Sequence, residues 1–139
     1  MKYLILILMT VNVSAKDLAT IVHPNNRVDA LSLGESRAIF AMKEIYWEHN
    51  RHPITIVTRP YLSDVHQNFV KNCLNGDPVR LRRLMQLRSN SGGGNRRKVA
   101  YSSRQMIKIV GDNPDAVGYD ETSYYVNTKG KVKEVRICG

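Results

Sequence analysis

The sequence predicts an α/β fold in which a mainly parallel sheet is flanked by helices. Short β-branched or apolar runs alternate along the chain with longer stretches whose apolar residues recur at helical spacing. The clearest strand is Ile54–Thr58, and a helix is expected to begin directly after it at Ser63. Strands that alternate with helices typically form parallel neighbours. A chain of 139 residues has room for one such domain.

Residues 1–15 are predicted to be a signal peptide. Lys2 gives a short basic start, an apolar run follows from Tyr3 to Met9, and Val13–Ala15 has the small residues of a cleavage site. The apolar run is too short for a permanent membrane span. The alternative to a signal peptide is a buried N-terminal strand. The mature domain would then be residues 16–139, located in the periplasm or outside a bacterium, with no membrane span left.

Two segments begin the predicted domain. A short apolar strand over 19–22 leads into the turn-rich residues 23–26. Ser32 and Glu35 then match a capping box, in which each side chain bonds the other residue's main-chain N–H. The helix that follows should run to the stop at 50–53, with an apolar stripe made of Ala38, Ile39, Met42 and Ile45.

Further caps and strands complete the alternation. The helix from Ser63 has an apolar side, and Asp77-Pro78 begins another helix with an aspartate cap and proline at the first position. Ser102 and Gln105 offer a second capping box. Residues 116–119 read as a short buried strand, and residues 132–137 alternate apolar with charged side chains, as an edge strand would. The apolar side of the Ser63 helix comprises Val65, Phe69, Val70, Cys73 and Leu74.

Arg59 and Ser63 mark a candidate anion site. The first N–H groups of a helix have no intrahelical partner and carry the positive end of its dipole. A guanidinium beside them suits a tetrahedral oxyanion. We therefore expect Arg59 to supply charge, Ser63 a hydroxyl, and the amides of Asp64 and Val65 two further donors. The alternative is a simple N-cap at Ser63 and a surface ion pair between Arg59 and Asp64.

Three segments carry a family resemblance: residues 33–40 with Trp47 downstream, residues 59–69, and residues 113–119. Together they resemble the substrate-binding proteins of bacterial phosphate ABC transporters, which are type 2 periplasmic binding proteins. The similarity is greater to short exported members that keep roughly one lobe. The resemblance implies one lobe of that fold, inorganic phosphate or a similar oxyanion as ligand, and a transporter or envelope protein as a candidate partner.

The resemblance also implies site residues. In the family, an arginine, a serine and helix-start amides hold phosphate, and this alignment sets Arg59 and Ser63 on those two positions. Asp64 and Val65 replace the family's glycine and threonine, and Tyr61 replaces its aspartate. These departures, and the absence of a counterpart for the other lobe, favour a second hypothesis. In it, the chain is an interaction or scaffold module that has lost the ligand.

Other chemistry is not indicated. No nucleophile–base pair or Gly-x-Ser-x-Gly turn is present, so we expect a non-enzyme without a cofactor. His49 and His52 read as surface histidines rather than metal ligands. Gly92–Gly94 lacks the residues of a nucleotide phosphate loop. Cys73 and Cys138 fit either a disulfide or two separate buried thiols.

Positive charge is the remaining feature. The formal net charge is +9, and without Lys2 the mature chain carries 20 basic and 12 acidic residues. A basic run is usually a solvated face, but it could also attract phosphate, nucleic acid or an anionic surface. Nucleic acid is disfavoured as a partner because aromatic residues do not interleave with the charges. The run comprises Arg80, Arg82, Arg83, Arg88, Arg96, Arg97 and Lys98.

Overall fold

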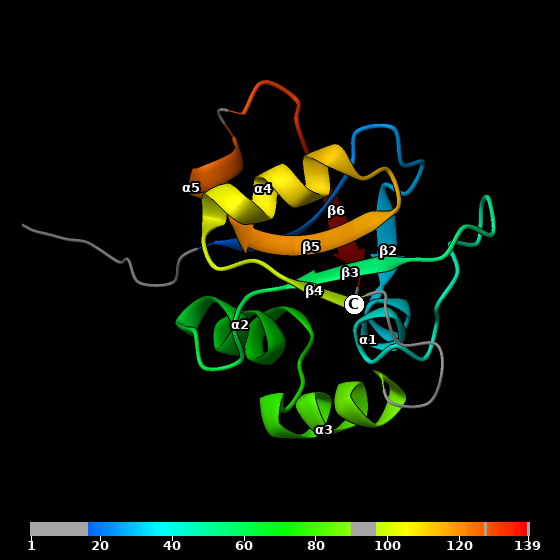
Figure 1. The fold of residues 1–139 in the computed structure, drawn as a ribbon, viewed down its shortest axis with the longest axis vertical. Coiled ribbons are helices and arrows are strands. Elements are labelled where there is room, and N and C mark those ends of the chain that lie inside the picture. Colours follow the sequence, from blue (N-terminus) through cyan, green and yellow to red (C-terminus); the bar gives the residue numbers. More distant parts are fainter. Residues whose placement is uncertain (1–16, 90–96, 127, 139) are drawn as a thin grey trace, which may run out of the picture.

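The structure, a computed structural model, describes residues 17–89, 97–126 and 128–138. The signal peptide predicted over 1–15 and the glycine run at 92–94 lie outside the described residues. Within the described ranges, the chain forms a six-stranded sheet with helices on both faces, which confirms the predicted α/β class (Figure 1). No helix in these ranges is both long and apolar enough to cross a membrane.

The sheet has the strand order β2-β6-β1-β5-β3-β4. Among the described residues, three of its pairings are parallel: β3 with β4, β3 with β5, and β2 with β6. β1 runs antiparallel to both of its neighbours, β5 and β6. The prediction of a mainly parallel sheet is therefore confirmed, with one reversed strand near its centre. The bounds are β1 Leu18–Val22, β2 Ala30–Ser32, β3 Thr55–Thr58, β4 Arg97–Val99, β5 Ala116–Glu121 and β6 Lys133–Cys138.

The prediction that residues 132–137 form an edge strand is wrong. β6 lies between β1 and β2, because the three residues of β2 pair alongside its C-terminal half. Its alternating pattern has a different cause. Val135 is buried in the core, while Glu134 and Arg136 lie on the exposed side of the strand. The pattern therefore reports one solvent-facing side of an interior strand.

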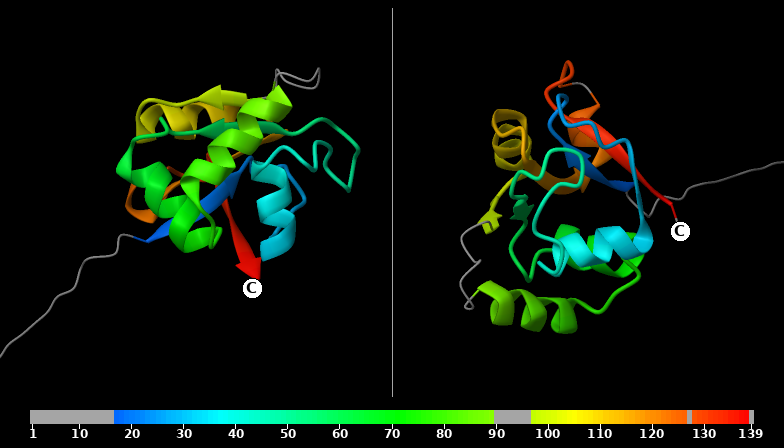
Figure 2. Two further views of the ribbon diagram at one scale, coloured as in Figure 1. Left: turned by 90° about the horizontal axis from the view of Figure 1, so that it is seen from below. Right: turned by 90° about the vertical axis from the view of Figure 1, so that its right-hand side faces the viewer.

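Helices cover the two faces of the sheet unequally (Figures 1 and 2). α1, α2 and α3 lie on one face, and α4 and α5 lie on the other. α2 continues directly into a π-helical turn, η1, before the chain reaches α3. The bounds are α1 Leu33–Phe40, α2 Asp64–Asn68, η1 Phe69–Cys73, α3 Pro78–Ser89, α4 Ser103–Asp112 and α5 Thr122–Tyr125.

The predicted helix starts are observed, although one helix is shorter than expected. Ser32 and Glu35 form both bonds of the capping box, at 3.0 and 2.8 Å. α1 ends at Phe40 rather than near residue 50, because Met42 adopts φ 60°, outside helical geometry. Ile45, expected on the apolar stripe, is 36% exposed.

The second predicted capping box is half formed. Ser102 Oγ accepts from Gln105 N at 3.0 Å, as expected. The return bond goes one residue further back, because Gln105 Oε1 accepts from Tyr101 N at 2.6 Å. The cap still satisfies donors at the start of α4.

Two core layers sandwich the sheet. On the α1–α3 side, the Phe69 and Tyr119 rings stack with their centroids 4.0 Å apart. On the α4 side, Val57 packs with Met106 and other residues of that helix. Because side chains alternate along a strand, β3 sends Ile56 to the first layer and Val57 to the second.

Candidate functional site

The site lies at the C-terminal ends of β3 and β4. β3 leads to α2 on one face of the sheet, whereas β4 leads to α4 on the other face (Figure 1). Neighbouring parallel strands whose connections diverge in this way leave a crevice at their carboxyl ends, where α/β proteins commonly bind ligands. Arg59 is the first residue after β3 and therefore stands at this crevice.

The Arg59 side chain turns toward α4. Residues 57 and 59 share a face of the strand, so Arg59 follows Val57 to the α4 side. Its Nη1 donates to Ser103 Oγ at 3.3 Å and contacts Asp120 Oδ2 at 3.4 Å, and the side chain is 13% exposed. Arg59 Nε is buried and has no partner among the described residues.

Asp120 is the buried carboxylate of the site, with a side-chain exposure of 0%. It accepts from Ser103 Oγ at 2.9 Å and from the main-chain N–H of Glu121 at 2.8 Å. Burial raises the pKa of Asp120, while these hydrogen bonds and the Arg59 charge oppose that rise. The carboxylate offsets much of the Arg59 charge inside the site.

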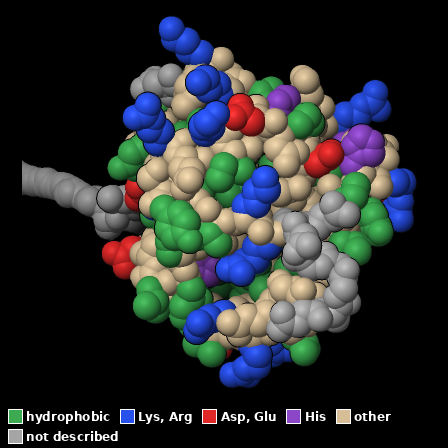
Figure 3. Space-filling view, viewed as in Figure 1, with side chains coloured by type: hydrophobic (Ala, Val, Ile, Leu, Met, Phe, Trp, Pro, Cys, Tyr) green, Lys and Arg blue, Asp and Glu red, His purple; other side chains and the backbone are tan. Residues whose placement is uncertain are grey.

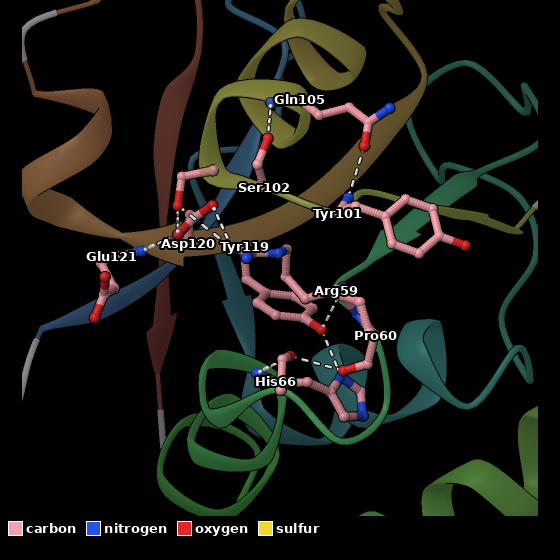
Figure 4. A network of polar contacts seen from close by, with 11 residues as sticks. Arg59, Pro60, His66, Tyr101, Ser102, Gln105, Tyr119, Asp120 and Glu121 are labelled. Carbon is pink, nitrogen blue, oxygen red and sulfur yellow. Dashed lines mark hydrogen bonds and ion pairs between the residues drawn. The ribbon is translucent and has the colours of Figure 1, made fainter.

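Tyr119 and His66 support the main chain at Arg59 from the other face (Figure 4). The Arg59 N–H donates to Tyr119 Oη at 2.9 Å, and this hydroxyl lies 2.5 Å from His66 Nδ1. Burial, with a smaller effect from Arg97, lowers the pKa of His66 to about 4. His66 is therefore neutral at pH 7. Because Tyr119 Oη already accepts from Arg59 N–H, we assign the tautomer in which His66 Nδ1 accepts the hydroxyl proton of Tyr119.

Ser63 caps α2, and its hydroxyl is already engaged. Ser63 Oγ donates to Pro60 O at 2.7 Å and accepts from His66 N at 3.3 Å. No hydrogen bond is recorded between the N–H groups of Asp64 or Val65 and any described residue, as expected for the first two residues of a helix. The Val65 side chain packs against the core, whereas Asp64 is exposed.

The loop between Arg59 and Ser63 is held by residues further along the chain. Tyr61 O accepts from Gln67 Nε2 at 2.7 Å. The Arg82 guanidinium lies over the Tyr61 ring at 4.4 Å from its centroid. These two contacts fix the tyrosine that stands where the resemblance assigns an aspartate.

Sequence reasoning missed the partners of Arg59. Among the described residues, its side-chain bonds go to Ser103 and Asp120, with none to residues 63–65. The ion pair considered with Asp64 is absent among these contacts, and Asp120 holds that role. The available signal was an acidic residue directly after the apolar strand 116–119.

Arg59 also lines an open groove of about 1030 Å³ that runs along α4. Its other basic lining residues include Arg104, Lys129 and Lys131, and Asp112 is the acidic residue on its wall. A basic, solvent-open groove concentrates anions near the guanidinium.

Residues 17–89, 97–126 and 128–138 contain no group of three or more His, Cys, Asp or Glu side chains that could hold a metal ion. His52 Nδ1 lies 3.2 Å from Asp115 Oδ1. Cys73 is a free thiol whose pKa is raised by burial. The Cys138 side chain lies outside the part of the chain that the structure describes.

No family model and no curated protein matches this sequence. Solved structures do. A structure described as a phosphate ABC transporter substrate-binding protein with bound phosphate, from Clostridium perfringens, matches at TM-score 0.67 and 23% identity, over 88% of this chain and 45% of that one. An ABC-type phosphate transport receptor from Vibrio cholerae matches at TM-score 0.65 and 19% identity, over 88% and 46%. PstS from Borrelia burgdorferi matches at TM-score 0.66 and 14% identity, over 88% and 47%.

These matches establish the fold. The chain has the fold of one lobe of these structures, a periplasmic-binding-protein-like architecture, as the resemblance implied. It spans less than half the length of each of these structures.

Proposed function

We propose that this chain is an exported oxyanion-binding protein that takes phosphate or a similar anion at the end of β3. In this proposal, Arg59 supplies charge, Ser63 a hydroxyl, and the amides of Asp64 and Val65 helix-start donors. Binding would require the Arg59 guanidinium to turn from Asp120 toward the start of α2, and the Ser63 hydroxyl to release Pro60 O. The fold shared with phosphate receptors and the order of these residues after the strand support the assignment. Export rests on the signal peptide predicted over 1–15.

The observation that carries the proposal is the position and state of the Arg59 guanidinium. It stands at the crevice between diverging strand connections, beside a basic groove, with a buried Nε that has no acceptor among the described residues. A buried donor without an acceptor raises the free energy of the folded state, and an anion oxygen brought to it would remove that penalty.

Two features predict weak binding by the isolated lobe. Asp120 already contacts the guanidinium and offsets its charge, so an incoming anion must compete with a carboxylate. The groove is also open to solvent, and water weakens charge-assisted hydrogen bonds. We therefore expect binding in the millimolar range, about 4 kcal/mol, rather than tight capture.

The test is calorimetric titration with phosphate, together with thermal melting over a phosphate series. Binding to the folded state should raise the melting temperature with concentration. Arg59→Ala would leave Asp120 buried and unpaired, so the informative variant is Arg59→Gln combined with Asp120→Asn. Lys43→Gln, an exposed cation on another surface, is the control. Heat and melting shift should vanish in the double variant and persist in the control. If the wild type shows neither heat of binding nor a melting shift at millimolar phosphate, the proposal is rejected.

A second candidate function is an interaction or scaffold module that keeps the lobe without its ligand. The Arg59–Asp120 pair favours it, because a neutralised guanidinium can serve structure alone. This candidate predicts no response to phosphate and a partner protein that Arg59→Gln/Asp120→Asn still captures from a periplasmic extract. Loss of that partner in the double variant would argue against it.

A further inference from the structure

One side of α3 faces solvent and lies away from the anion site. This surface, called here the outward face of α3, comprises Val79, Arg80, Arg82, Arg83, Gln86 and Leu87. Val79, Arg83 and Leu87 are spaced four residues apart and so form one line along the helix. Val79 is 52% exposed and Leu87 67% exposed. The opposite side of the helix buries Met85 in the core.

The outward face is strongly basic. Residues 78–89 include four arginines and no Asp or Glu. No ion pair is recorded for Arg80, Arg82 or Arg83 with any residue that the structure describes. Arg82 instead lies over the Tyr61 ring, 4.4 Å from its centroid.

Its shape suits a flat partner. α3 is the outermost layer on its side of the molecule, and it lies in front when the fold is seen from below (Figure 2, left). The space-filling view shows Lys and Arg side chains next to hydrophobic ones along the lower edge, over α3 (Figure 3). A convex helix can meet a planar surface along its whole length, which a recessed site cannot do.

We propose that the outward face of α3 docks on an anionic lipid bilayer. Arginines pair with headgroup phosphates, while Val79 and Leu87 between them reach shallowly into the interface. Nucleic acid fits this face less well, because base stacking needs exposed aromatic rings and the Tyr61 ring is covered by Arg82.

The test measures partitioning of the full chain onto vesicles of phosphatidylglycerol and phosphatidylcholine in equal parts, against pure phosphatidylcholine. One variant replaces Arg80, Arg82 and Arg83 by glutamine. The matched control removes the same charge from the α4 side, as Arg104→Gln, Lys108→Gln and Lys131→Gln. Residues 1–15 are the same in every variant, so any membrane affinity of that segment cancels.

We expect binding to the anionic vesicles only. Three arginines at the surface predict a loss of about 100-fold in the α3 variant at roughly 0.05 M salt, and less than about threefold in the control. Val79→Ser with Leu87→Ser should weaken binding by several-fold, and this loss should persist at high salt. Circular dichroism checks that each variant is folded.

Three results would overturn the proposal. Equal losses in the two triple variants would indicate adsorption by net charge. Equal binding to both vesicle types would exclude recognition of anionic lipid. Salt-sensitive binding of an oligothymidylate through the same three arginines, without vesicle binding, would assign the face to nucleic acid. None of these outcomes depends on whether Arg59 binds phosphate.

Discussion

Protonation of His66 should destabilise the fold as the pH falls from about 6.5 toward 4. The pKa of His66 is lowered from 6.5 to about 4 in the folded protein, mainly by burial. The unfolded chain therefore binds a proton more readily across this window, and stability is lost as the solution becomes more acidic. The neutral, buried His66 stabilises the fold fully only at pH values above 6.5, the pKa of this histidine in the unfolded chain.

The size of the effect follows from the two pKa values. At pH 5, the imidazole is almost fully protonated in the unfolded chain and about a tenth protonated in the folded one. This difference corresponds to about 2 kcal/mol relative to pH 7.5.

His66→Asn provides the control. Its amide oxygen can take the position of Nδ1 and accept from the Tyr119 hydroxyl, and it does not titrate. The raised pKa of Asp120 acts in the opposite direction, since its protonation favours the folded state at low pH. That contribution is present in both proteins and cancels in the comparison.

Urea unfolding at pH 7.5 and pH 5 measures the free energy of unfolding in each protein. We expect the wild type to lose about 1–2 kcal/mol more than His66→Asn between the two pH values. Identical losses would refute the argument that a neutral, buried His66 holds Tyr119.

Two other predictions concern the packing and the anion site. A Cβ at Gly118 would stand 2.6 Å from Met106 Sδ, so Gly118→Ala should destabilise by about 1–3 kcal/mol in urea unfolding. Gly34→Ala is the control, because its Cβ would lie 3.9 Å from the nearest described neighbour, Ser32 Oγ, and the change should be neutral or slightly stabilising in its helix. Equal losses in the free energy of unfolding for the two variants would contradict the packing argument. Asp120→Asn removes the carboxylate that competes for the guanidinium and should tighten phosphate binding roughly fivefold to tenfold in calorimetry. An unchanged or weaker affinity would show that Asp120 does not limit the site.

Local rules explain the parts of the fold that could be predicted. Ser32, Ser63 and Ser102 each cap a helix through a main-chain N–H three residues ahead, so the signal lies within one turn. Residues 55–58 and 116–121 form buried strands whose apolar runs are clear in the sequence. These elements required no knowledge of distant neighbours.

The elements that were missed depend on distant pairing. β2 and β4 have only three residues each, too few for a periodic pattern, and exist through their pairing with β6 and β3. The end of α1 depends on the turn at Met42, which the apolar stripe does not reveal.

By itself, the sequence determined the alternation of strands and helices, the helix starts, and a guanidinium at the exit of a buried strand. Only the tertiary structure decided which carboxylate meets Arg59, because Asp120 is 61 residues away in the chain and reaches it through the pairing of β3 with β5. The physical reason is the alternation of side chains along paired strands. The register between β3 and β5 places Arg59 and Asp120 together on the α4 face of the sheet, whereas Ser63 begins α2 on the opposite face.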